Sequence, residues 1–326
     1  MINLIYNEMI KIVRKKRLFI IMGIIAALAA LFTYAQVKEH QESVKEAGTE
    51  DWRTQVQQEI INMQNRLNSG GISGEWKEIL QIRVKQQQYY LVHDINPSAP
   101  GAPTFMKTFA ENSIDLLLPL MVMVIASDLV SSEYTNGTVK LLLTRPVKRW
   151  KILMSKYITL LLAVSFIVLA TGVLTYGVSG IALGYSGWTL PVLTGFSAEG
   201  GQLDTSAVQM MSLWQYILMD YGLVWFVAVI VGTLTFALSS LMKSTASVMG
   251  VMLASLIAGA ILANMVSAWD SAKYLFMVNL NLTDYLTGMS PPIEGMSLGF
   301  SMTVLLVWAA AGLAASFFFF TRKDVY

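Results

Sequence analysis

Cysteine is absent from the 326-residue chain, and histidine occurs only as His40 and His93. Without cysteine no disulfide can form, and no thiolate can bind a metal ion. Both histidines fall in one polar segment, where isolated histidines are expected to be solvated side chains. We therefore expect neither a metal site nor a disulfide-stapled domain.

The sequence also lacks the motifs of ATP hydrolysis and of common hydrolases. It has no G-x-x-x-x-G-K-[ST] phosphate loop, and the fragment LMKSTAS at 241–247 lacks the glycines whose amides would surround a phosphate. It has no G-x-S-x-G elbow, no H-E-x-x-H pair and no nucleic-acid-binding motif. We expect no catalytic site and no cofactor in this chain, and no nucleic-acid partner.

Charge is scarce as well: 13% of residues are charged and 55% are hydrophobic, with a mean hydropathy of +0.54. A membrane protein is the class that this composition favours. A bilayer core takes roughly 20 apolar residues as a helix. The runs of suitable length are 18–36, 114–130, 158–183, 214–238, 248–268 and 298–320. Because they are continuous rather than alternating, they predict an all-α integral membrane protein with six transmembrane helices.

The first run could instead be a signal peptide, since five basic residues precede it. Its apolar core is too long for one, and no clear small-residue cleavage site follows, so we favour an uncleaved span. Lysine and arginine gather before the first run and between the second and third, whereas 184–213 has none. The positive-inside rule then predicts that both termini are cytoplasmic.

The N-terminal residues alternate with helical periodicity. One face would carry Ile2, Ile5, Met9 and Ile12, and the other Asn3, Asn7, Lys11 and Arg14. This pattern predicts an amphipathic helix in the inner leaflet, with a cytoplasmic extension of the first span as the equal alternative. The predicted organisation is 1–36, amphipathic helix and first span; 37–113, outer segment; 114–183, second and third spans with their cytoplasmic loop; 184–213, outer loop; 214–268, fourth and fifth spans; 269–297, outer semi-apolar re-entrant segment; and 298–326, sixth span and tail.

Residues 37–113 form the largest polar region. Apolar residues recur every three or four positions on both sides of the turn signal NSGGISG, which predicts an extracellular helical hairpin. A mobile charged loop is the alternative. Two acids near the outer ends of spans, Asp220 and Asp115, are possible pathway residues, because a carboxylate in a membrane span is costly.

The stretch between the second and third spans, 131–156, is rich in charge. Thr138 can cap a short helix and Pro146 can begin the next, with Arg145, Lys148 and Arg149 in the bend between them. By composition alone this is a basic elbow at the membrane surface. The order of its residues, EYTNGTVKLLLTRPVKRWKILMSK, resembles the cytoplasmic signature of ABC-2 type transporter permeases. The matching positions are Glu133, Gly137, Thr138, Leu143, Pro146, Arg149 and Lys156.

Three further segments resemble the same family: YNEMIKIVRKKRLF near the N-terminus, LSSLMKSTASV at 238–248 and the ending FFFFTRKDVY. The resemblance implies that 133–156, including Arg145, together with Glu8 and Lys11, couples the spans to a separate ABC ATPase subunit dimer that holds the ATP and Mg. It also implies a second permease chain in the same lipid bilayer. The outer segment 37–113 is larger than the minimal family pattern.

The expected function is therefore that of a permease subunit in the bacterial cell membrane, exporting a hydrophobic or amphipathic compound such as an antimicrobial peptide, an antibiotic or a lipid-like molecule. A membrane sensor or scaffold, whose outer hairpin binds a ligand, is an alternative from another class. An ion-coupled transporter using Asp220 is a second alternative.

Overall fold

A computed structural model describes residues 1–69, 74–138, 147–199, 202–263, 269–289 and 291–322. Of these described residues, 76% are helical. Within them, five helices are long and apolar enough to cross a membrane. They are α2 (Arg17–Ala47), α9 (Arg149–Leu183), α10 (Leu213–Leu241), α11 (Thr245–Ala263) and α13 (Leu298–Arg322). These helices contain the predicted runs 18–36, 158–183, 214–238 and 298–320 in full, and α11 contains the described part of 248–268, residues 248–263.

The predicted second span, 114–130, falls in a bent part of the structure. It consists of two shorter helices, α6 (Leu117–Ala126) and α7 (Asp128–Thr135), bent by 40° at Ser127. The hydroxyl of Ser239 on α10 fills the break: it donates to the Ser127 carbonyl at 2.7 Å and accepts from the Ser131 amide at 2.9 Å. An inserted side chain that satisfies freed backbone groups is a recognised cause of a sharp kink. Counted as one, the bent pair would be a sixth span.

Helix α10 forms the centre of the bundle and contacts α6, α9 and α13. Val227 and Val231 are fully buried in the same cluster as Val122 of α6. At Gly232, an added Cβ would lie 3.0 Å from a methyl of Val122, so glycine allows α6 and α10 to approach closely. The most buried spanning helix is therefore also the one that holds the α6/α7 bend.

The N-terminal helix α1 (Ile2–Arg14) is separate from α2, because Lys16 between them adopts a left-handed conformation with φ 56°. It contacts α9 through a face that includes the buried Glu8 and Ile12, while Ile2 is exposed. Of the two alternatives from the sequence, the structure has the separate helix rather than a continuous extension of the first span.

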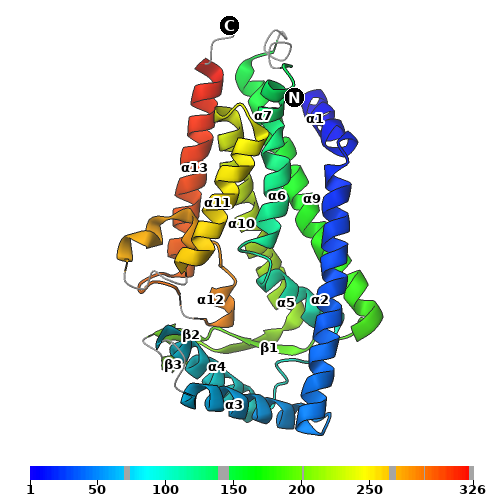
Figure 1. The fold of residues 1–326 in the computed structure, drawn as a ribbon, viewed down its shortest axis with the longest axis vertical. Helices are drawn as coiled ribbons and strands as arrows, with labels where there is room; N and C mark the ends of the chain where they lie inside the picture. Colours follow the sequence, from blue (N-terminus) through cyan, green and yellow to red (C-terminus); the bar gives the residue numbers. More distant parts are fainter. Residues whose placement is uncertain (70–73, 139–146, 200–201, 264–268, 290, 323–326) are drawn as a thin grey trace.

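The opposite end of the molecule carries most of the residues outside the spans (Figure 1). Helices α3 (Trp52–Asn68) and α4 (Gly74–Val92) pack together through Val56, Ile60 and Val84. A third helix, α5 (Ala102–Glu111), begins beside Pro103 and contacts α9 and α10. The N-terminus, the end of α13 and the end of α7 lie at the other end of the bundle (Figure 1).

Residues 184–213 are not simply a loop, and the fold is not strictly all-α. They include two antiparallel strand pairs, β1 (Pro191–Thr194) with β4 (Gln209–Ser212) and β2 (Ser197–Glu199) with β3 (Gln202–Asp204). In the first pair Val192 lies opposite Met211. The segment 269–297 contains short helices, η1 (Asp270–Tyr274), η2 (Phe276–Asn279) and α12 (Asp284–Thr287). The Thr194 hydroxyl donates to the Leu286 carbonyl at 3.0 Å, which ties the strands to α12.

Candidate functional site

A buried lysine joins α1, α7 and α9 at the end of the bundle that carries the termini. The Lys156 side chain is 1% exposed. Its Nζ donates to Glu8 at 2.7 Å, to Glu133 at 3.2 Å and to the Leu129 carbonyl at 2.8 Å. An ammonium has three donors, so each Lys156 donor can have its own partner.

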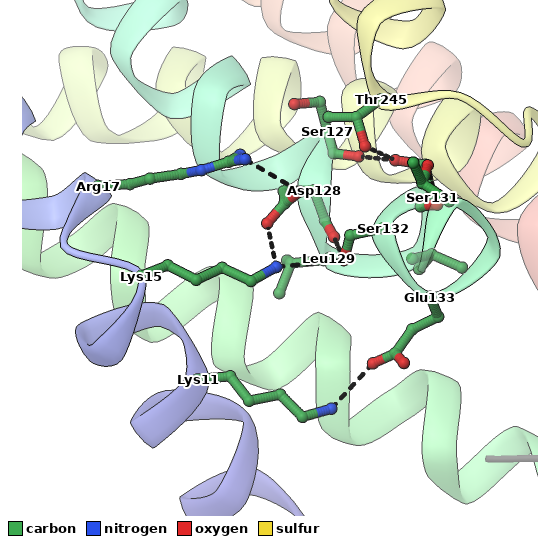
Figure 2. Close-up of polar contacts among 12 residues, drawn as sticks. Lys11, Lys15, Arg17, Ser127, Asp128, Leu129, Ser131, Ser132, Glu133 and Thr245 are labelled. Atoms are coloured by element: carbon green, nitrogen blue, oxygen red, sulfur yellow. Dashed lines mark hydrogen bonds and ion pairs between the residues drawn. The ribbon is translucent and has the colours of Figure 1, made fainter. Parts of the chain in front are cut away.

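A second lysine closes the same network from the solvent side. Lys11 Nζ lies 2.8 Å from a Glu133 oxygen (Figure 2). It lies 2.8 Å from a Glu8 oxygen as well, and the Lys11 side chain is 46% exposed. Partial burial lowers the pKa of Lys11, but its hydrogen bonds to Glu133 and Glu8 raise it further, and the net shift is upward. Lys11 therefore stays charged over the neutral range. We call Glu8, Lys11, Glu133 and Lys156 the ion lock.

A threonine five positions after Glu133 also contacts the ion lock. Thr138, just beyond α7, donates its hydroxyl to the Glu133 carboxylate. Gly137, between Glu133 and Thr138 in the sequence, has a φ of 69°, a left-handed backbone conformation that favours glycine. Five predicted coupling residues thus converge: Glu8, Lys11, Glu133, Thr138 and Lys156. Because three of them are buried, they hold elements of this chain together and do not form an exposed docking face.

The remaining predicted coupling residues lie elsewhere. Arg149, at the start of α9, donates to the Thr321 carbonyl near the end of α13 at 3.3 Å. Leu143, Arg145 and Pro146 lie outside the described residues, as does the short helix predicted after Thr138. Exposed positions just after Glu133 on the chain are Thr135, Asn136 and Gly137, and Lys148 is exposed at the start of α9.

A second ionic contact beside the ion lock was not predicted from the sequence. Asp128, the first residue of α7, forms ion pairs with Lys15 and with Arg17, the latter at 3.3 Å (Figure 2). Lys15 also donates to the Ser132 hydroxyl at 3.3 Å. The sequence did contain a signal for this contact. An acid near the end of a span needs a partner, and the predicted topology places the basic residues before the first span on the same side of the membrane as Asp128. The cavity among these side chains has a volume of about 40 Å³, too small for a substrate.

The two possible pathway acids lie near the other end of the bundle. Asp220, two turns into α10, is fully buried, and neither of its carboxylate oxygens has a hydrogen-bond partner among the described residues. One turn away, the Tyr216 hydroxyl donates to Glu111 at 2.6 Å, and Glu111 lies 3.7 Å from Lys107. Asp115 lies between α5 and α6 and is partly exposed. Among the described residues, no group of three or more His, Cys, Asp or Glu could hold a metal ion.

We expect Asp220→Asn to leave the protein as stable as the wild type or more stable. A buried carboxyl group without partners carries a desolvation cost, and asparagine has nearly the same shape and cannot ionise. The melting temperature of the purified protein should stay level or rise, and any transport activity should persist. Loss of transport at unchanged melting temperature would instead support ion coupling through Asp220.

Comparisons with known proteins give relatives without a described activity. Over 329 aligned residues the chain is 27% identical to "Uncharacterized protein YhcI" of Bacillus subtilis (strain 168), covering 100% of this chain and 99% of the relative. It is 26% identical over 215 residues to "Uncharacterized membrane protein YdbK" of the same organism, covering 65% of this chain and 80% of the relative. Together with the apolar helices, the second relative indicates a membrane location. A family profile described as "Protein of unknown function (DUF2705)" matches residues 81–326. Because this match spans more than half of the sequence, the chain belongs to that family.

Proposed function

We propose that this chain is the permease subunit of an ABC-2 type transporter in the bacterial cell membrane, with both termini cytoplasmic. In this proposal it exports a hydrophobic or amphipathic compound, such as an antimicrobial peptide, an antibiotic or a lipid-like molecule. ATP and Mg bind to a separate ABC ATPase dimer, and a second permease chain completes the pathway.

The observation that carries the proposal is the ion lock. Its four residues come from two sequence segments that resemble the permease family independently of each other, the N-terminal helix and the loop after the second span. Glu8 lies 148 positions before Lys156, yet their side chains are 2.7 Å apart. A contact between the two segments is what a shared coupling role requires.

The arrangement suggests how a push on the loop could reach the spans. Glu133 and Thr138 lie at the end of α7, and Lys156 lies two turns into α9, a 35-residue helix. Because Lys156 is bound to α1 and to α7 at once, movement of either helix at this end also displaces α9. The ion lock transmits the motion, while the exposed residues around Asn136 and Lys148 contact the ATPase. The pathway is then exposed to one side of the membrane and to the other in turn, as the population shifts between two packings of the spans.

The sensor or scaffold alternative is favoured by one observation, a cavity of about 490 Å³ lined by residues of α3 and α4. The two functions differ in their partner at the end of the bundle that carries the termini. A transporter subunit requires an ATPase there, whereas a sensor or scaffold requires a signalling protein.

The test is co-isolation. The full-length protein with an affinity tag is expressed in its native host and extracted in mild detergent, and ABC ATPase subunits that co-purify are identified by mass spectrometry. We expect the ATPase to co-purify in a fixed ratio and its ATP hydrolysis to depend on the permease. Purification of the chain without any nucleotide-binding subunit, under conditions that preserve its fold, would contradict the proposal.

A further inference from the structure

A cavity of about 490 Å³ lies at the end of the bundle that carries the α3/α4 hairpin. Its walls come from α3 and α4, from the part of α2 that extends past the first apolar run, and from Met289 after α12. Gln86 on α4 donates to the Thr287 carbonyl at 3.0 Å, which fixes the hairpin to α12 across the cavity. The volume lies within the range of about 300–1,000 Å³ that is typical of ligand sites. We call this cavity the hairpin pocket.

Four charged side chains line the hairpin pocket, two of each sign: Glu39, Glu59, Arg66 and Arg83. None of the four forms an ion pair within 4 Å with another of the described residues. Partial shielding from solvent by the pocket walls and the like charge of Glu39 raise the pKa of the exposed Glu59 carboxyl, and Arg83 offsets only part of that shift. An incoming cation would relieve the repulsion between the two carboxylates, and the arginines could bind an acid.

Apolar and amide groups complete the pocket. Leu80 is buried, and Met63, Tyr90 and Met289 are partly buried, so they offer apolar contact to a ligand. The Nε2 of Gln87 donates to Glu59 at 3.4 Å, but its buried Oε1 has no donor among the described residues. A buried carbonyl oxygen is normally hydrogen-bonded, and a peptide N–H is a suitable donor.

We propose that the hairpin pocket binds a short peptide that carries an amine, an acidic group and an apolar side chain between them. The amine faces Glu39 and Glu59, and the acidic group faces Arg66 and Arg83. The apolar side chain lies against Leu80 and the methionines, and a backbone N–H donates to Gln87. This inference does not rest on the proposed transport function, because a peptide could be captured for export or sensed in place.

Binding to the full-length protein in phosphatidylcholine nanodiscs tests this. The probe is a pool of tetrapeptides with free termini, and the peptides retained are identified by mass spectrometry. The comparison pool has acetylated N-termini and amidated C-termini. We expect retention of free-terminus peptides with apolar central residues, and at least tenfold weaker retention by Glu59→Gln and by Arg83→Gln. Glu46→Gln, an exposed acid on α2 outside the pocket, should bind like the wild type.

The result that would overturn the proposal is retention no greater than by empty nanodiscs, or equal retention of the blocked pool. Equal binding by Glu59→Gln and the wild type would also overturn the assignment to this pocket. Glycerophosphoethanolamine is tested in parallel, because it carries an amine and a phosphate; if it alone binds, the ligand is a lipid headgroup and not a peptide. Because Glu59 and Arg83 are exposed, both variants should have the melting temperature of the wild type. An unchanged melting temperature separates a loss of binding from a loss of folding.

Discussion

Replacing Lys156 with methionine should lower the melting temperature of the protein by several degrees. The substitution keeps most of the side-chain volume but removes the ammonium from between Glu8 and Glu133, which are both buried. Breaking a buried ion pair costs about 3–5 kcal/mol, because the remaining charges stay desolvated. Lys11 still contacts both carboxylates, so we expect a loss near the lower end of that range.

The matched control is Lys148→Met. Lys148 lies eight positions earlier, is exposed and forms no ion pair with the described residues of the ion lock. Thermal unfolding in detergent, followed by tryptophan fluorescence or by size-exclusion chromatography after heating, compares the two variants with the wild type. If Lys156→Met and Lys148→Met had the same melting temperature, the ion lock would contribute no stability. Its proposed role in holding α1 against α7 and α9 would then be wrong.

Glu133→Lys should abolish co-isolation with the ATPase. The change brings a third cation against Lys11 and Lys156, in place of the carboxylate that both lysines share. Repulsion in this buried site should separate α1 from α7 and displace the loop that begins at Asn136. The expected recovery of the ATPase in a pull-down falls at least tenfold, while Glu294→Lys, an exposed acid near the opposite end, leaves it unchanged.

Gly137→Pro separates docking from folding. Proline holds φ near −65°, whereas Gly137 has a φ of 69° and an added Cβ would meet nothing within 4 Å. The substitution should therefore alter the turn after α7 without disturbing the packed spans. We expect a melting temperature near that of the wild type, and no ATPase recovered with this variant in the pull-down. Full recovery of the ATPase in pull-downs of both Glu133→Lys and Gly137→Pro would contradict a coupling role for this region.

The sequence predicts the spans well because their signal is local. Continuous apolar runs identify α2, α9, α10, α11 and α13, and helical periodicity identifies α1. The bend at Ser127 escapes this reasoning, since the hydroxyl that stabilises it belongs to Ser239, 112 positions away. The strands in 184–213 escape it as well, because each is only three or four residues long. Patterns of such length do not stand out in a segment rich in glycine and small polar residues.

The site was predictable only as a grouping of residues. The resemblance places Glu8 and Lys11 with Glu133 and Lys156, but not the geometry in which each carboxylate is shared by two lysines. Nor does it indicate that three of these residues are buried, which changes their expected role from contacting the partner to holding α1, α7 and α9 together. Asp128 with Lys15 and Arg17 depends on the same docking of α1, and tertiary packing of this kind leaves no local trace.

The natural absence of cysteine makes one measurement decisive for the central claim that the end of α7 contacts an ATPase. Asn136→Cys places a single thiol on the exposed turn after α7, and Gln57→Cys places one on exposed α3 at the other end of the bundle. Each variant is expressed with the ABC ATPase that co-purifies with the wild type, and membranes are treated with a short thiol-to-amine cross-linker. The account predicts a permease–ATPase adduct from Asn136→Cys and none from Gln57→Cys. An adduct from Gln57→Cys alone, or none from Asn136→Cys while the ATPase co-purifies, would contradict it.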